Sequence, residues 1–152
     1  MTRRVVPGLL LATLTACTST EPETYPDIAG DYAGIGVGIT EGINVSSTFQ
    51  LTLNQSGGSF HGQGTTEGIW TDLSGTDPYQ SEYTFEGTVD AGDPPGLVVT
   101  FNAGCVDNFY RGNVLPSGDI VLDGQAQVTG AECEPTGEVL EVVIYLGREG
   151  ET

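Results

Sequence analysis

The sequence predicts an all-β protein: a single small antiparallel meander barrel of about eight strands. Four observations support this fold class. Apolar and polar residues alternate with a period of two from residue 28 onward, which is typical of strands with one buried and one solvated face. Turn-forming residues separate these segments. Glycine is abundant, at 23 of 152 residues, and no segment keeps a helical periodicity between capping residues.

The expected strands run between successive groups of turn residues. They span Gly30–Thr40, Ser47–Gln55, Ser59–Glu67, Ser81–Asp90, Gly96–Asn102, Asn108–Leu115, Asp119–Thr129 and Glu138–Gly147. The turns between them include Gln55–Gly58, Ala91–Gly96 and Leu115–Gly118. Such short connections make successive strands antiparallel. The segment Thr71–Gln80 is expected to be a long polar connection.

The first of these strands contains the run GIGVG at positions 34–38. A dinucleotide-binding fingerprint needs the spacing G-x-G-x-x-G between a strand and a helix, and neither condition is met here. In a strand, the glycines share one face while Ile35 and Val37 share the other. The run therefore predicts a bent strand.

The later strands alternate regularly and predict the barrel interior. In the last strand, Leu140 and Leu146 should face inward, while Glu141, Val143 and Tyr145 face outward. A shift of one residue would bury the Glu141 carboxylate, which is costly. Closure of the barrel requires this strand to pair with the first, which removes two exposed edges. The residues expected inside include Leu51, Phe85, Leu122, Val142 and Ile144.

A large residue followed two positions later by glycine recurs along the chain. The pattern occurs at 32–34, 60–62, 85–87, 110–112 and 122–124. Glycine lets a strand bend sharply, and an aromatic ring can cover the exposed backbone. The recurrence favours a closed barrel. A two-sheet β-sandwich satisfies the same alternation and stays open as the alternative architecture.

The first 17 residues have the pattern of an export signal. Arg3 and Arg4 precede an apolar run, Val5–Leu14, that is shorter than the roughly 20 residues of a membrane-spanning helix. The run ends in Leu14-Thr15-Ala16-Cys17, which resembles the lipobox of bacterial lipoproteins. The resemblance implies removal of residues 1–16, lipidation of Cys17, and a protein exported and lipid-anchored to the bacterial cell envelope. An ordinary signal peptide and a twin-arginine signal are the alternatives.

After the lipobox, the composition divides the chain into a tether and a domain. Residues 17–27 are polar, acidic and twice interrupted by proline, which predicts a flexible, extended tether. Residues 28–148 carry the alternating pattern and suffice for one domain with its own core. This domain begins with Gly30-Asp31-Tyr32, which is similar to the Gly-x-Trp of lipocalins. Together with the strand number, the resemblance implies a lipocalin-like barrel.

Charge excludes two classes of partner. The chain has a net charge of −17, and removal of residues 1–16 takes away two arginines and no acidic residue, giving −19. Only Arg111 and Arg148 then remain, and the chain has no lysine. Nucleic-acid binding and binding to anionic lipid both need a basic surface. The membrane is therefore expected as a partner only through the lipid anchor.

Cysteine number predicts one disulfide. The chain has three cysteines, and lipidation of Cys17 leaves Cys105 and Cys133 as a pair. Outside the cytosol such a pair is expected to be oxidised. A metal or redox role is the alternative, although the chain has no Cys-x-x-Cys and no histidine near either cysteine.

Few side chains suggest catalysis or metal binding. His61 is the only histidine, and the alternation places it on the solvated face of a strand. Asp72, Asp77 and Glu82 lack the spacing of an EF-hand, so we expect a solvated connection in preference to a loose Ca²⁺ site. We therefore expect no catalytic residue, no metal and no cofactor. Aromatic residues beside the same connection could contact a ligand or belong to the core: Trp70, Tyr79 and Tyr83.

Three classes of function stay open. The first is a non-enzymatic barrel that binds a small apolar ligand. The second is a structural or interaction lipoprotein that contacts another envelope protein. The third is a hydrolase, for which the sequence shows no nucleophile paired with a base. Interior volume distinguishes the first two, because an empty apolar pocket favours ligand binding and a filled barrel favours interaction.

Overall fold

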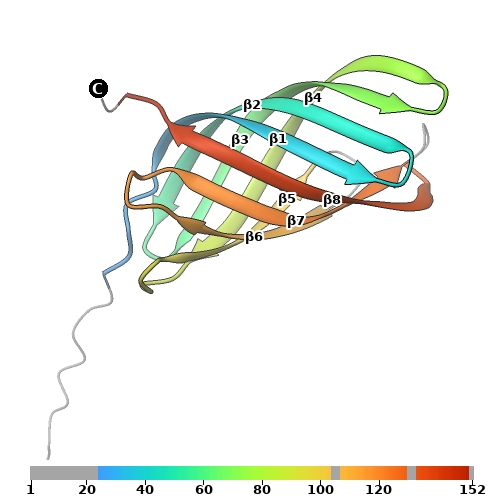
Figure 1. The fold of residues 1–152 in the computed structure, drawn as a ribbon. Coiled ribbons are helices and arrows are strands. Elements are labelled where there is room, and N and C mark those ends of the chain that lie inside the picture. Colours follow the sequence, from blue (N-terminus) through green and yellow to red (C-terminus); the bar gives the residue numbers. More distant parts are fainter. Residues whose placement is uncertain (1–23, 104–106, 130–132, 151–152) are drawn as a thin grey trace, which may run out of the picture.

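The computed structural model describes residues 24–103, 107–129 and 133–150. These residues form a closed antiparallel barrel in which each strand pairs with the next and β8 pairs with β1 (Figure 1). The described residues include no helix, and so none that could cross a membrane. The predicted barrel is confirmed and the sandwich is wrong. The strands are β1 (Gly30–Thr40), β2 (Ile43–Ser56), β3 (Ser59–Asp72), β4 (Gly75–Val89), β5 (Gly96–Asn102), β6 (Asp107–Val114), β7 (Ile120–Thr129) and β8 (Pro135–Arg148).

Pairing of the first and last strands closes the barrel as predicted. The register runs from Tyr32 opposite Arg148 to Ile39 opposite Glu141. Along β8, the inward residues Leu140, Val142, Ile144 and Leu146 are buried or half-buried, while Glu141, Val143 and Tyr145 are exposed. The predicted facing of β8 is therefore confirmed, and neither β1 nor β8 is left as an open edge.

The expected long connection at Thr71–Gln80 is wrong. β3 continues to Asp72 and β4 begins at Gly75, so the two strands form an extended hairpin. The Asp72 carboxylate closes its tip by accepting hydrogen bonds from the backbone nitrogens of Ser74 (2.7 Å) and Gly75 (3.2 Å). This part of β4 has no β5 partner, because pairing with β5 starts only at Thr84. Such an edge tolerates polar residues and Pro78, which made the segment resemble a loop.

The recurrent glycines allow large side chains to lie across the neighbouring strand. Phe60 lies opposite Gly87, and Gly62 lies opposite Phe85. A Cβ at Gly62 would lie 2.5 Å from the Phe85 ring, and one at Gly87 would lie 2.6 Å from the Phe60 ring. The 110–112 and 122–124 motifs pair in the same reciprocal way between β6 and β7. In four of the five motifs, the large residue therefore covers a glycine on the adjacent strand. Tyr32 is the exception, because it lies opposite Leu51 and Arg148.

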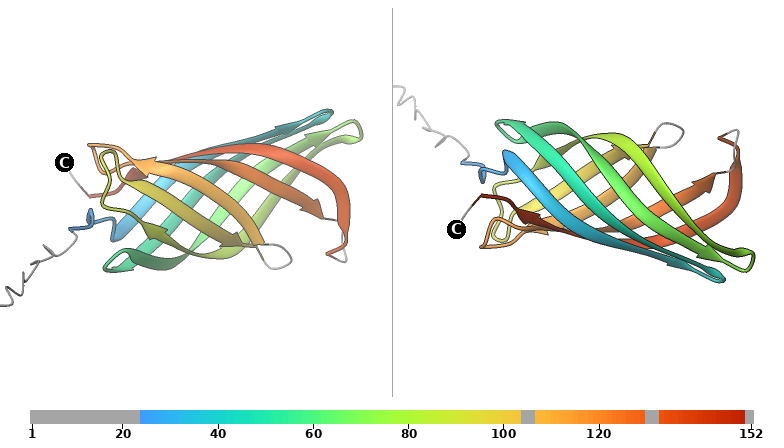
Figure 2. Two further views of the ribbon diagram at one scale, coloured as in Figure 1. Left: turned by 90° about the horizontal axis from the view of Figure 1, so that it is seen from below. Right: turned by 90° about the horizontal axis from the view of Figure 1, so that it is seen from above.

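One end of the barrel is filled by side chains. It is the end at which the β2–β3, β4–β5 and β6–β7 turns lie, together with both ends of the described chain (Figures 1 and 2). The apolar side chains here are at most 6% exposed. They include Leu53, Phe60, Val89, Leu97, Val114, Ile120 and Leu122.

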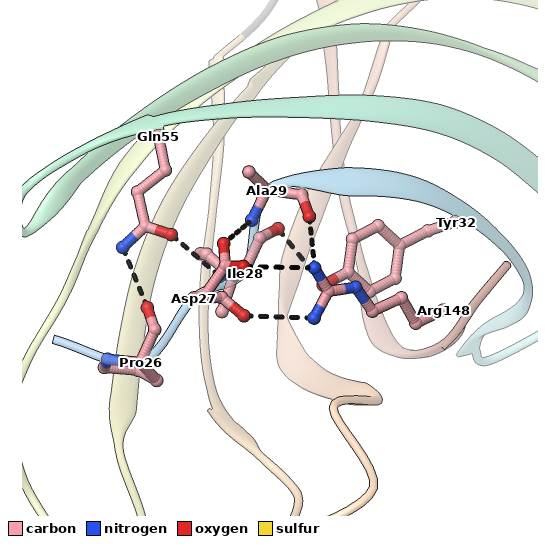
Figure 3. A network of polar contacts seen from close by, with 7 residues as sticks. All are labelled: Pro26, Asp27, Ile28, Ala29, Tyr32, Gln55 and Arg148. Atoms are coloured by element: carbon pink, nitrogen blue, oxygen red, sulfur yellow. Dashed lines mark hydrogen bonds and ion pairs between the residues drawn. The ribbon is translucent and has the colours of Figure 1, made fainter. Parts of the chain in front are cut away.

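The segment before β1 covers this filled end. Ile28 is fully buried. Its backbone nitrogen donates to Gln55 Oε1 at 2.7 Å, and its carbonyl oxygen accepts from Tyr32 Oη at 3.1 Å (Figure 3). Arg148 donates to the carbonyl oxygens of Ala29 (2.6 Å) and Asp27 (3.2 Å). These contacts hold the chain against the end of the barrel from Asp27 onward. They therefore begin one residue before the expected start of the domain at residue 28.

The tripeptide Gly30-Asp31-Tyr32 lies at this same filled end. Gly30 has a φ of +141°, a conformation that L side chains rarely adopt. The Arg148 side chain lies over it, 3.4 Å from the position of a Cβ. Tyr32 is 1% exposed. These residues therefore fix the start of β1 beneath the end of β8.

Candidate functional site

The opposite end of the barrel is hollow. A cavity of about 440 Å³ lies inside it and is lined by residues from all eight strands. The β1–β2, β3–β4 and β7–β8 hairpins lie at this end of the barrel (Figures 1 and 2). The volume of the cavity is within the range of small-molecule sites.

Aromatic rings form the floor of this cavity. Tyr83 packs edge-on against Phe49, with ring centroids 5.9 Å apart, and obliquely against Phe101 at 5.2 Å. Phe101 in turn packs edge-on against Tyr110 at 5.1 Å. These separations are those of favourable aromatic pairs. The layer divides the filled end of the barrel from the hollow end.

The walls above the floor are mostly apolar. β1 contributes Gly36 and Gly38. The Phe49 ring packs against Gly36, 2.6 Å from the position of a Cβ, whereas a Cβ at Gly38 would meet its nearest neighbours at 3.4 Å. The half-buried aromatic residues Trp70 and Tyr79 lie on the β3–β4 side. The Tyr79 hydroxyl is joined by a hydrogen bond to the hydroxyl of Ser47 on β2. The other apolar residues of the lining include Val45, Trp70, Ala126, Val128, Leu140, Val142 and Ile144. Trp70, Tyr79 and Tyr83 thus all line the cavity, although the connection beside which they were expected is strand.

Two buried hydroxyls in the cavity lining have no hydrogen-bond partner within the described part of the chain: Thr66 Oγ1 and Tyr83 Oη. Burial raises the pKa of Tyr83 well above its ordinary value. Burial, with a smaller contribution from Tyr79, raises the pKa of Tyr110 to about 12. Both phenols are therefore protonated at neutral pH.

The outside of the barrel offers weaker candidates. Two hollows of about 670 and 730 Å³ lie over β1–β5 and β2–β6, respectively, and are lined mostly by outward-facing polar side chains. His61 belongs to the second and is exposed, as the alternation predicted. It lies opposite Glu86 in the strand register. Over the described ranges it makes no hydrogen bond or ion pair that could activate a nucleophile.

The carboxylates considered for Ca²⁺ do not form a site. Asp72 is occupied in the hairpin turn, where hydrogen bonds from the Ser74 side chain and backbone, and from Trp70, lower its pKa. Asp77 and Glu82 follow on β4, both exposed. Within residues 24–103, 107–129 and 133–150, no group of three or more His, Cys, Asp or Glu side chains could hold a metal ion.

The predicted modification sites fall largely outside the described residues. Cys17 and Cys105 lie outside them, and Cys133 is exposed between β7 and β8 with a φ of +63°. β5 ends at Asn102 and β6 begins at Asp107, so the connection that contains Cys105 starts and ends at the hollow end, as does the β7–β8 connection. The Cys105–Cys133 pairing stays a prediction.

We expect this disulfide to join two connections at the mouth of the barrel. Closing a loop of this length would stabilise the fold by about 3–4 kcal/mol in the chain-entropy model, which is an upper figure. Non-reduced peptide mapping of the exported protein should recover the two cysteines in one linked peptide. Two free thiols in that digest would contradict the pairing.

Sequence reasoning identified the apolar interior but missed the cavity residues that matter most chemically. Thr66 was expected to lie within a strand and was given no role. A stretch of β3 with only small residues on its inner face, at positions 62, 64, 66 and 68, is the pattern that could have indicated space. Comparison of this chain with family models, with curated proteins and with solved structures finds no match.

Proposed function

We propose that this protein is a lipid-anchored lipoprotein of the bacterial cell envelope whose lipocalin-like barrel binds a small apolar ligand without catalysis. The observation that carries the proposal is the cavity of about 440 Å³, lined mostly by aromatic and aliphatic side chains, in a barrel whose other end is filled. Concave, mostly apolar surface of this kind is characteristic of ligand sites. Nothing in that lining resembles a nucleophile paired with a base.

The position of the tether supports this function. The segment before β1 lies against the filled end, held by Gln55 and Arg148, so the chain that leads back to Cys17 leaves from the end opposite the cavity. A lipid on Cys17 would thus leave the cavity mouth directed away from the anchoring point. From Cys17 to Thr24 the extended chain reaches at most about 25 Å, at about 3.3 Å per residue. The ligand would then enter from the aqueous side.

Contact with another envelope protein is the second candidate function. An apolar stripe lies on the outer face where β1 and β8 pair, with Ile35 opposite Tyr145 and Val37 opposite Val143. Ile35 is 60% exposed and Val143 is 55% exposed. Exposed apolar patches often mark interaction surfaces. The hollow interior favours ligand binding as the main function, because an interaction module needs no internal space.

A cavity-filling variant tests the proposal. Ala126 faces the cavity from β7, and Ala126→Phe places a ring in the space that a ligand would use. We expect binding of the neutral fluorophore N-phenyl-1-naphthylamine to weaken at least about 10-fold, which corresponds to about 1.4 kcal/mol. Thermal stability should be retained, because the ring enters empty apolar space. Fluorescence titration and thermal unfolding measure the two quantities.

The matched control is Asp123→Phe, which adds the same ring to the outer face of the same strand. It should bind the fluorophore as the wild type does. Equal affinity of the wild type and Ala126→Phe, with both folded, would show that the cavity is not the binding site. Absence of saturable binding to the wild type would favour the interaction function.

A further inference from the structure

The two unpartnered hydroxyls of the cavity require an explanation. Buried polar atoms almost always have a hydrogen-bond partner, and leaving one without a partner is unfavourable. Within the described residues, Thr66 Oγ1 and Tyr83 Oη are the buried side-chain atoms that have none. Tyr83 is only 5% exposed. Both residues belong to the cavity lining, although their two hydroxyl oxygens have almost no accessible surface. A bound molecule supplies the missing partner when these side chains turn toward it.

The two hydroxyls belong to one region of the cavity. Tyr83 on β4 lies opposite Gly64 on β3. A Cβ at Gly64 would lie 2.7 Å from Tyr83 Oη, so the glycine leaves room for the phenol. Thr66 follows two residues later on the same face of β3. The polar pair thus lies where the aromatic floor, to which Tyr83 belongs, meets the β3 wall. Among the residues described, no other buried side-chain polar atom lacks a hydrogen-bond partner.

The lining contains no charged side chain. None of the residues that line the cavity is Asp, Glu, Lys, Arg or His. Arg148 is held at the opposite end by the segment before β1, and Arg111 is exposed on the outer face of β6. A buried carboxylate or ammonium group on a ligand would find no opposite charge here, and burying an unpaired charge is very unfavourable. The chain's strong net negative charge further disfavours anions.

We propose that the cavity selects an uncharged ligand with an apolar body and a single hydroxyl or carbonyl group, which Thr66 and Tyr83 bind. This inference rests on the proposed ligand-binding function and adds the ligand's chemical class. Each hydroxyl can both donate and accept a hydrogen bond, so the pair suits either oxygen group. The aromatic floor and the aliphatic wall then contact the apolar body.

A matched series of probes tests the selection. Decane, 1-decanol, decanoate and decylammonium share one chain length and differ in the head group. The protein is residues 17–152 with Cys17→Ser, which retains every residue that the structure describes. Trp70 is the only tryptophan of the chain and lines the cavity, so its emission reports occupancy. At pH 7, 1-decanol should bind at least about 10-fold more tightly than either ion.

Tyr83→Phe separates hydrogen bonding from apolar contact. It should weaken 1-decanol binding about 5- to 10-fold, the range expected for one hydrogen bond, and leave decane binding unchanged. The variant should fold, because it removes an unpartnered hydroxyl. Tyr32→Phe is the matched control: it removes a buried phenol hydroxyl at the filled end, where Tyr32 donates to Ile28, and should leave 1-decanol binding unchanged.

Each outcome is decisive. If decane and 1-decanol bind equally and Tyr83→Phe has no effect, the polar recognition is overturned while ligand binding stands. If decanoate or decylammonium binds as tightly as 1-decanol, the selection for uncharged ligands is overturned. If none of the four probes changes Trp70 emission or competes with N-phenyl-1-naphthylamine, both this inference and the proposed function fail.

Discussion

Gly62→Ala is expected to destabilise the barrel by about 3 kcal/mol or more, at or above the upper range for overpacked cores. The new Cβ would lie 2.1 Å from the Thr52 carbonyl oxygen and 2.5 Å from the Phe85 ring. Neither neighbour can move freely, because the oxygen belongs to the backbone of β2 and the ring is 5% exposed in the core. Small domains are stable by only about 5–15 kcal/mol, so much of the folding free energy would be lost. Urea unfolding followed by circular dichroism measures the difference.

Gly38→Ala is the matched control at the hollow end. Its φ is not in the positive region, and a Cβ there would meet its nearest neighbours, the Leu140 and Val142 side chains, at 3.4 Å, an ordinary contact. We expect a stability within about 1 kcal/mol of the wild type, because alanine also reduces the entropy of the unfolded chain. Equal losses in both variants would contradict the division of the barrel into a filled end and a hollow end.

Cys17→Ser is expected to abolish lipid attachment completely. The serine hydroxyl cannot form the thioether that the lipobox resemblance implies. A protein with a thioether-linked diacylglyceryl group is held stably, whereas a single acyl chain gives only marginal binding. Metabolic labelling with a radioactive fatty acid should mark the wild type and leave the variant unlabelled.

Cys133→Ser controls for loss of a cysteine as such. It should retain the fatty-acid label and the mature mass expected for cleavage before Cys17. Equal labelling of the wild type and Cys17→Ser would refute lipidation at this residue, and the anchored form of the proposed function with it.

Local pattern was sufficient to predict most of the fold. The alternation in β8 predicted both the buried face, with Leu140 and Ile144, and the exposed face, with Glu141. Closure between β1 and β8 followed from the same pattern, because an unpaired edge is unfavourable. The hairpin at residues 71–80 could not be predicted in this way. Its residues lie on an edge with polar neighbours, where alternation no longer separates core from solvent.

The candidate site was less predictable for a physical reason. Alternation indicates which face of a strand is inside, but the same inward residues can fill an interior or line a hollow one. Whether Phe49, Tyr83 and Phe101 meet as a floor depends on strand register and coiling, which bring them from β2, β4 and β5. The same is true of Thr66, whose lack of a hydrogen-bond partner is a property of the assembled barrel.

Native mass spectrometry of the exported protein tests the central claim, that the hollow end holds a ligand, most directly. The wild type should carry a non-covalent adduct of small mass that is released on unfolding and is absent from Ala126→Phe. If the wild type and the filled variant show the same mass without any adduct, and neither binds N-phenyl-1-naphthylamine, the cavity has no ligand and the account is contradicted.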